Sequence, residues 1–187
     1  MENILNVLGI AGSLRKNSYN KALLNAAIEV QPSNMSIQTF DIQSIPLYNS
    51  DIEEQGTPEP VKIFKQKISL ADGLLIVTPE YNYSIPGVLK NAIDWASRPP
   101  SNSPLNKKPL GITGASMGLG GTIRSQLHLR QVAIFTNMMD MKRPEVFVQR
   151  AQEKFDANGN LTDESTREHL KRFLSSFQEW ILQFKIF

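Results

Sequence analysis

The stretch GLLIVTPEYNYSIPGVLKNAIDWA, residues 73–96, decides the fold of this chain. Its first six residues, 73–78, form a short apolar run that ends before a proline, which is typical of a strand buried on both faces of a parallel sheet. After a loop, the apolar residues of 88–96 recur at three- and four-residue steps, the spacing of a helix that packs one face on a sheet. A buried strand followed by such a helix is the repeating unit of an α/β protein.

The same unit recurs on both sides of this stretch. Further strands are predicted at Ile4–Ala11, at Pro109–Ala115 and, more weakly, at Ser36–Asp41. A last strand is predicted within Met138–Val148, although Asp140 is out of place in an apolar strand. Apolar stripes with helical spacing fall between and after the strands, at Leu23, Leu24, Ala27 and Ile28; Val61, Phe64, Ile68 and Ala71; Val88, Leu89, Ala92, Ile93 and Ala96; Ile123 to Phe135; and Leu170, Phe173, Leu174, Phe177, Ile181 and Phe184.

Strands and helices that alternate in this way predict a doubly wound, five-stranded parallel sheet with helices on both faces. The expected strand order is the flavodoxin-like 2-1-3-4-5, whose ligand lies beyond the carboxyl ends of the strands. Function is therefore expected in the loops that follow strands 1, 3 and 4. The last helix is predicted to begin after an N-cap at Thr162.

Composition excludes several classes of function. The 187 residues fit a single domain, residues 1–187. The chain has no cysteine, and His128 and His169 are not spaced as metal ligands, so thiolate chemistry and a metal site are not expected. A net charge of +2 with no basic run longer than two residues predicts no nucleic-acid partner. The longest apolar run is far too short for a membrane span and no basic leader precedes the first strand, which together predict a cytoplasmic protein without a membrane partner.

The first loop, GSLRKNSYN at 12–20, has the residues of a phosphate site. The hydroxyls of Ser13 and Ser18 and the amide of Asn20 are hydrogen-bond donors, and Arg15 offers the forked geometry that phosphate prefers. The helix N-terminus that follows adds free N–H groups and a partial positive charge. The alternative is an ordinary polar turn in which one of these residues only caps the helix. The loop matches neither a P-loop nor a dinucleotide fingerprint, so triphosphate hydrolysis is not indicated.

The second and third loops suit a flat ring. The loop TPEYNYSIPG at 78–87 has two prolines and two tyrosines, so rigid backbone amides and aromatic faces stand together there, as a heteroaromatic ligand requires. The alternative interpretation of this loop is a rigid surface turn whose tyrosines pack on the next helix. The loop GASMGLGGT at 114–122 is rich in glycine, which allows close approach of a ligand to the backbone. Three such loops at one sheet edge predict a ligand site more strongly than any one of them.

These motifs resemble those of the NAD(P)H-dependent FMN reductase family, in the branch of bacterial quinone and chromate reductases. The loop 12–20 is similar to the family's phosphate loop, and 79–87 with its continuation LKNAIDW at 89–95 is similar to its signature. The likeness extends from Leu5 to about Glu145. The resemblance implies that FMN phosphate binds to Ser13, Arg15, Ser18, Tyr19 and Asn20, and that the isoalloxazine edge binds to Pro79, Glu80, Tyr81 and Asn82, with Ser116 contributing from the third loop.

The resemblance also implies the reaction. NADPH or NADH reduces bound FMN, and an acceptor such as a quinone, free flavin, an azo compound or chromate then takes the electrons. No catalytic side chain is required, because the hydride chemistry belongs to the cofactor. Glu80 is expected to orient the loop or to bind the flavin rather than to act as a general acid. The family forms homodimers or homotetramers, which implies an interface near Trp95–Arg98 and Gln126–Arg130.

Two alternatives remain open at this point. A flavodoxin-type electron carrier would hold FMN but would not oxidise NAD(P)H directly. Such carriers tend to be acidic and to use a Thr-rich phosphate loop, whereas this chain has a net charge of +2 and an arginine in its loop. The second alternative is a non-catalytic nucleotide-binding domain on the same fold, since the fold alone does not determine activity.

Overall fold

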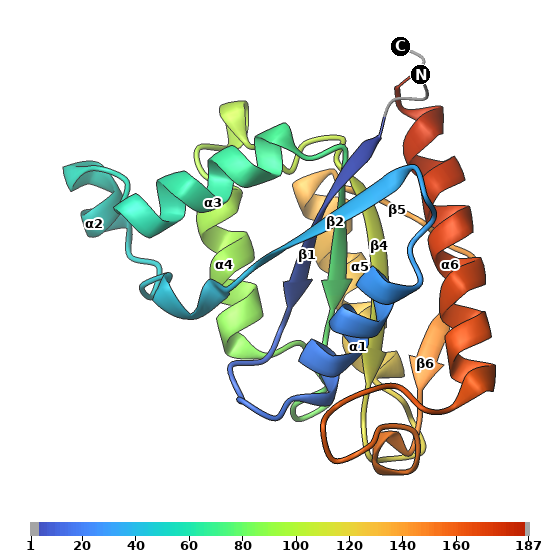
Figure 1. Cartoon of the computed structure of the whole chain (residues 1–187). Coiled ribbons are helices and arrows are strands. Elements are labelled where there is room, and N and C mark those ends of the chain that lie inside the picture. Colours follow the sequence, from blue (N-terminus) through green and yellow to red (C-terminus); the bar gives the residue numbers. More distant parts are fainter. Residues whose placement is uncertain (1–3, 186–187) are drawn as a thin grey trace.

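The computed structural model describes residues 4–185, with a central parallel sheet covered by helices on both faces (Figure 1). The strand order is β2-β1-β3-β4-β5, and β6 also pairs with β4. The predicted flavodoxin-like order is therefore confirmed, with one additional strand. The strands are β1 (Leu5–Ala11), β2 (Met35–Phe40), β3 (Gly73–Val77), β4 (Pro109–Ala115), β5 (Met139–Asp140) and β6 (Val146–Val148).

Two hydrophobic cores lie on opposite sides of the sheet. One core packs α1 (Tyr19–Glu29) and α6 (Glu164–Gln183) on the sheet, and the other packs α3 (Glu59–Leu70), α4 (Gly87–Ala96) and α5 (Ile123–Thr136). The short helix α2 (Ser50–Gln55) buries no residue and projects from the body (Figure 1). No helix within residues 4–185 is long and apolar enough to cross a membrane. The described residues also form short 3₁₀ turns at Ile42–Ser44, Pro100–Asn102 and Ala151–Glu153.

Strand β3 is the centre of both cores. All five of its residues are buried, and successive side chains point to opposite faces of a sheet. Leu75 and Val77 accordingly join the core under α1 and α6, whereas Leu74 and Ile76 join the core under α3, α4 and α5. A continuous apolar run is what such a position requires.

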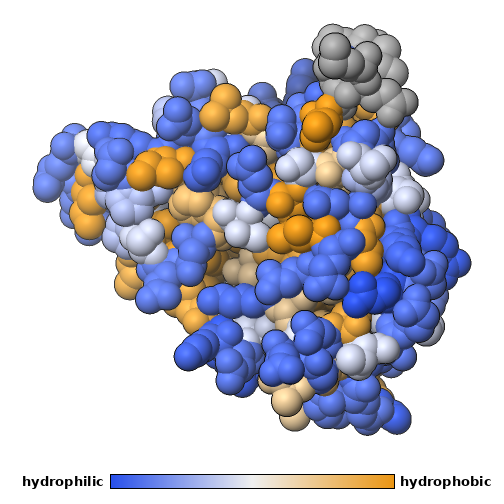
Figure 2. Space-filling view, in the orientation of Figure 1, coloured by the Kyte–Doolittle hydropathy of each residue, from blue (hydrophilic) through white to orange (hydrophobic). Residues whose placement is uncertain are grey.

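On the surface that carries α1 and β2, hydrophobic residues form small patches among hydrophilic ones (Figure 2).

The fifth strand is split, which corrects the prediction of a single strand within Met138–Val148. The start of β4 pairs with β5, and its end, from Thr113 to Ala115, pairs with β6. Asp140, the last residue of β5, is a buried carboxylate whose Oδ2 accepts a hydrogen bond from Arg130 Nη1 at 2.6 Å. Burial alone would raise the pKa of Asp140, but hydrogen bonds from Lys142 and Arg130 outweigh it and hold the pKa below its ordinary value. The strand is interrupted where this ion pair must be accommodated.

The N-cap of α6 is Asp163 and not Thr162, so that prediction was wrong by one residue. The Asp163 carboxylate accepts a hydrogen bond from the backbone N–H of Thr166 at 2.9 Å, and Lys154 Nζ donates to the same oxygen. Hydrogen bonds from Thr166 and Lys154 lower the pKa of Asp163 to about 2. Thr162 instead donates its hydroxyl hydrogen to the carbonyl oxygen of Lys154. A carboxylate is the stronger acceptor at a helix N-terminus, which explains the difference.

Gly114 is predicted to tolerate no side chain. A Cβ at this position, near the carboxyl end of β4, would overlap the Thr78 carbonyl oxygen and the Thr122 hydroxyl group. Gly114→Ala should therefore destabilise the protein by about 1–3 kcal/mol in urea unfolding. The matched control is Gly87→Ala in the first turn of α4, where a Cβ would meet nothing within 4 Å. Its unfolding free energy should stay unchanged or rise by up to about 1 kcal/mol; equal losses in the two variants would contradict the prediction.

Candidate functional site

The three loops that the sequence singled out meet at the carboxyl edge of the sheet. Asn20, in the first turn of α1, joins the first loop to the third: its side-chain oxygen accepts from Ala115 N at 2.9 Å, and its side-chain nitrogen donates to Ala115 O at 3.0 Å. Ser125, in the first turn of α5 just after the third loop, joins this helix to the second loop by donating its hydroxyl hydrogen to the Pro79 carbonyl oxygen at 2.8 Å. Both bridging residues are buried. The loops therefore form one connected surface.

The first loop leads into α1 through a serine cap. Ser18 Oγ accepts hydrogen bonds from the backbone N–H groups of Asn20 and Lys21, at 3.2 and 3.5 Å. Ser18 thus caps the helix, and its hydroxyl hydrogen is still available to a ligand. Ser13 is buried as well, whereas Arg15 is exposed and pairs with no carboxylate within residues 4–185.

Asn20 lies deeper than the sequence suggests. It was predicted to donate its amide to phosphate, but the residue is only 3% exposed and its side chain holds the Ala115 peptide group. One of its two amide hydrogens serves that contact, and the second is not bonded to the protein in the described part of the chain. Asn20 therefore fixes the position of the first loop relative to β4.

The second loop is a tight turn in a strained conformation. Tyr81 and Ser84 exchange two backbone hydrogen bonds of 3.0 Å, so Asn82 and Tyr83 are the two central residues of a two-residue hairpin. Both have positive φ angles, 51° and 65°. This conformation suits glycine and asparagine but costs an aromatic residue on the order of 1 kcal/mol or more. Contacts outside the turn must offset that cost.

Helix α5 supplies those contacts. The Arg124 guanidinium lies over the Tyr83 ring, 4.0 Å from its centre, and His128 Nδ1 lies 2.7 Å from Ser84 Oγ. Both α5 residues are on the same side of the helix, one turn apart. The turn is thereby fixed at its tip and at its end.

Glu80 fixes the start of the same turn because its side chain caps α5, a helix that lies far from it in the sequence. Its Oε2 accepts hydrogen bonds from the backbone N–H groups of Arg124 and Ser125, at 3.0 and 3.3 Å. The residue at the N-cap position, Thr122, has a left-handed backbone and makes no side-chain capping bond. A carboxylate at a helix N-terminus also interacts favourably with the helix dipole. The expectation that Glu80 orients the loop agrees with this geometry.

The likeness to known proteins follows the same segments. A model of the family described as NADPH-dependent FMN reductase matches residues 5–153. The chain belongs to the NADPH-dependent FMN reductase family. A relative from Pseudomonas aeruginosa, called NAD(P)H-dependent FMN reductase, is 50% identical over 181 residues, 97% of each chain. A 2-hydroxy-1,4-benzoquinone reductase from a Burkholderia species is 45% identical over 95% of this chain and 96% of its own.

A solved structure shares both the fold and the family. It is the flavoenzyme NAD(P)H:acceptor oxidoreductase FerB of Paracoccus denitrificans, with a TM-score of 0.89 and 34% identity over 96% of this chain and 98% of the other. As a family member, the chain is an oxidoreductase that uses FMN as cofactor and NAD(P)H as co-substrate. These predictions from the sequence are confirmed.

The loops of this reductase suit FMN because many of their backbone N–H groups are not hydrogen-bonded within the described part of the protein. Within residues 4–185, several backbone N–H groups in the first loop and at the start of α1 have no protein acceptor. Such a row at a helix N-terminus binds a phosphate well. The strained turn offers a second set of free N–H groups on the neighbouring loop, after β3, and half-buried Ser116 lies in the third loop. The free amides belong to Ser13, Leu14, Lys16, Asn17, Ser18 and Tyr19 in the first loop, and to Glu80, Asn82 and Tyr83 in the second.

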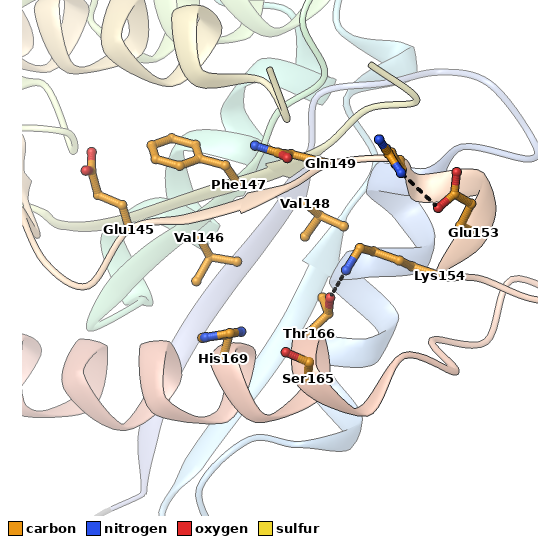
Figure 3. Close-up of a pocket in the computed structure, with 11 residues that line it drawn as sticks. Glu145, Val146, Phe147, Val148, Gln149, Glu153, Lys154, Ser165, Thr166 and His169 are labelled. Carbon is orange, nitrogen blue, oxygen red and sulfur yellow. Dashed lines mark hydrogen bonds and ion pairs between the residues drawn. The ribbon is translucent and has the colours of Figure 1, made fainter. Parts of the chain in front are cut away.

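Two of the cavities in the described part of the chain bear on this surface. One of about 370 Å³ adjoins the first loop and is also lined by Met117 and by residues 156–159, which sequence reasoning missed. The other, of about 610 Å³, lies between β6 and α6 (Figure 3). None of the predicted site residues lines the second cavity, and its Lys154 is already bonded to Thr166 (Figure 3). The first cavity is therefore the one connected with the site.

Glu80 offers a direct test of how the site is held together. Glu80→Ala removes the acceptor of two backbone N–H groups and loosens the turn from α5, so FMN should bind about tenfold more weakly, equivalent to about 1.4 kcal/mol. Glu80→Gln keeps a side-chain oxygen and should lose at most about threefold. Titration of the apoprotein with FMN, followed by quenching of flavin fluorescence, measures both. If the two variants bind FMN equally well, Glu80 does not position the loop through this contact.

Proposed function

We propose that this chain is an FMN-dependent NAD(P)H:quinone reductase whose single domain holds the cofactor at the three loops. The observation that carries the proposal is two sets of free backbone N–H groups on neighbouring loops of one sheet edge, one set at a helix N-terminus and the other in a rigid turn. A ligand with a phosphate at one end and a flat polar ring at the other fits this arrangement. The residues proposed to hold FMN are Ser13, Arg15, Ser18, Tyr19 and Asn20 for the phosphate, and Pro79, Glu80, Tyr81, Asn82 and Ser116 for the ring.

The side chains divide the binding task between them. Ser13, Ser18 and Arg15 face the phosphate with hydroxyl and guanidinium donors, and Asn20 holds the loop in place through Ala115. When bound, FMN supplies the hydride- and electron-transfer chemistry. The protein then needs neither a nucleophile nor a metal ion for the reaction.

The second loop acts on the ring edge. The amides of Asn82 and Tyr83 are fixed by the turn before any ligand binds, so they need no reorganisation to stabilise negative charge that develops nearby. Glu80 is turned toward α5, which supports a positioning role and not that of a general acid. Tyr81 and Tyr83 are exposed, and they border the side from which a second substrate approaches.

Quinones are the proposed electron acceptors. The support is the name of the Burkholderia relative, which acts on 2-hydroxy-1,4-benzoquinone. Reduction of free flavin, azo compounds or chromate is compatible with an exposed ring face. A cytoplasmic location without nucleic-acid or membrane partners, expected from the sequence, stays a prediction.

A visible spectrum of the purified protein tests the proposal and separates it from the electron-carrier alternative. Under anaerobic conditions the flavin absorbance should bleach on addition of NADPH or NADH and should return on addition of benzoquinone. Flavin that is bound but not reduced by either nucleotide would favour the carrier. A colourless protein that also fails to bind added FMN would overturn the assignment of all three loops.

We also propose that two copies of the chain associate through α5. Of the two ranges implied by the resemblance, Trp95 and Gln126 are buried within the chain, whereas Leu127 is exposed. A stripe of exposed apolar residues continues along α5 from Leu127 to Ile134 and Phe135, which are 78% and 89% exposed. Large apolar residues repeated on one helix face are typical of a helix-to-helix interface.

Phe135→Glu should therefore shift the protein from dimer to monomer in sedimentation velocity experiments. The matched control is Leu70→Glu in α3, which introduces the same charge at a residue that is 72% exposed on another helix. The control should keep the mass of the wild type. A monomeric wild type, or equal behaviour of the two variants, would contradict the proposed interface.

A further inference from the structure

Met117, in the third loop, is the most exposed methionine in the part of the chain that the structure describes. Its exposed fraction is 60%, whereas Met35, Met138 and Met141 are at most 4% exposed and Met139 is half-buried. Oxidants convert the thioether of an accessible methionine to a sulfoxide. The chain has no cysteine that would compete for the oxidant. Within residues 4–185, Met117 is therefore the sulfur atom that an oxidant in solution reaches most easily.

Backbone hydrogen bonds on both sides of Met117 keep it exposed. The Ser116 N–H donates to the Val148 carbonyl oxygen at 3.0 Å. On the other side, the Gly118 carbonyl oxygen accepts from Arg150 N at 3.3 Å. These bonds attach the third loop to β6 and to the segment that follows it, and Met117 belongs to neither hydrophobic core. The exposure is thus a property of the fold at this position.

Met117 also lies between the two parts of the proposed FMN site. The preceding residue, Ser116, is proposed to contact the isoalloxazine ring, and Met117 itself lines the cavity of about 370 Å³ beside Arg15 and Tyr19 of the phosphate loop. Flavins also carry out oxygen chemistry, and two-electron reduction of molecular oxygen gives hydrogen peroxide. Peroxide that forms at this site is released next to the Met117 sulfur.

The other described methionines lie at the opposite edge of the sheet. Met35 is the first residue of β2, and Met139 pairs with Pro109, the first residue of β4. Met138 and Met141 flank β5, which pairs with the same end of β4. The proposed FMN site is at the carboxyl ends of the strands, so the length of the sheet separates it from these four residues. Both exposure and position therefore favour Met117 as the residue that peroxide oxidises.

We propose that Met117 is a redox-sensitive site, where hydrogen peroxide produced by the enzyme oxidises the thioether to a sulfoxide and thereby weakens FMN binding. Molecular oxygen becomes peroxide when it takes up the hydride of NAD(P)H, passed on by the flavin, and one proton from water. One oxygen atom of the peroxide then bonds to an electron pair of the sulfur, which is oxidised. The O–O bond breaks, and water leaves as the reduced product. The inference rests on the proposed flavin site and goes beyond it by adding a modification.

The sulfoxide weakens FMN binding because it competes with the phosphate for the same donors. Oxidation replaces an apolar side chain by a polar one with a hydrogen-bond-accepting oxygen. Arg15, Lys16 and Lys21 line the cavity together with Met117, and each of them can donate to that oxygen. A cation that donates to the sulfoxide contributes less to the phosphate. An enzyme that reduces oxygen in the absence of a quinone thus loses its flavin and stops producing peroxide.

Peptide mass spectrometry after turnover tests the oxidation. With NADPH in air and without a quinone, Met117 of the FMN-loaded enzyme should gain one oxygen atom at least about tenfold faster than Met35, Met138 or Met141, because those three are buried. The same number of turnovers under anaerobic conditions, with benzoquinone as acceptor, should leave Met117 unoxidised. Equal oxidation of the four methionines in air, or oxidation of Met117 without oxygen, would overturn the inference.

Titration of the apoprotein with FMN tests the consequence without relying on turnover. After treatment with added hydrogen peroxide, the wild type should bind FMN about 3- to 10-fold more weakly, because the sulfoxide engages donors of the phosphate. Met117→Leu keeps an apolar side chain of similar size but has no sulfur at this position, so its FMN affinity should be the same before and after treatment. The matched control is Met139→Leu, which removes the half-buried methionine at the other edge of the sheet and should show the same loss as the wild type.

The two measurements separate the modification from the activity. If the wild type oxidises neither NADPH nor NADH, the proposed activity fails, while the titration with added peroxide still decides whether oxidation of Met117 controls FMN binding. An FMN affinity that stays unchanged when peptide mapping shows Met117 fully oxidised would overturn the inference. An equal loss of affinity in Met117→Leu would overturn it as well, because the effect would then come from another residue.

Discussion

The carboxylate of Glu80 at the start of α5 is the interaction on which the site depends. It satisfies two N–H groups that the helix leaves free, and Thr122 at the N-cap position does not serve them. It also fixes the residue just before a turn that the chain would not adopt unaided, since Tyr83 has a positive φ angle. One ion thus stabilises the helix and the turn together. A loop held in this way presents its free amides in a fixed direction, which a flavin ring requires.

The geometry of the sheet places these contacts within reach of one another. Because β3 is buried on both faces, its loop must leave at the carboxyl edge between the loops that follow β1 and β4. Gly114 allows the Thr78 carbonyl group and Thr122 to approach β4 closely, and Asn20 then connects α1 to the adjacent residue, Ala115. The binding surface is therefore a consequence of strand order and of two or three buried polar contacts that cross between loops.

Sequence alone predicts what depends on local pattern. The period of the apolar residues locates the strands from Leu5, Gly73 and Pro109 within one residue of their positions. Asp140 interrupts the apolar pattern of the last strand. Its ion-pair partner Arg130 is ten residues away in the sequence, so the split into β5 and β6 is not visible in the pattern. Glu80 and Arg124 are 44 residues apart, and no periodicity connects them. Contacts between loops follow from the assembled sheet, and they are the part of the site that sequence reasoning misses.

The same distinction explains why the charge of the cavity beside the first loop is not readable from the sequence. The charged residues of this cavity come from two distant segments, because Lys16 and Lys21 lie on either side of the serine cap and the opposite wall comes from residues 156–159. The turn around Asp156 donates hydrogen bonds to both of its carboxylate oxygens, which hold its pKa below the ordinary value and so keep it ionised. The charge of the cavity is therefore the sum of the cations and this one carboxylate. With three cations against one carboxylate, the net charge next to the phosphate loop is positive, which suits the phosphate of FMN.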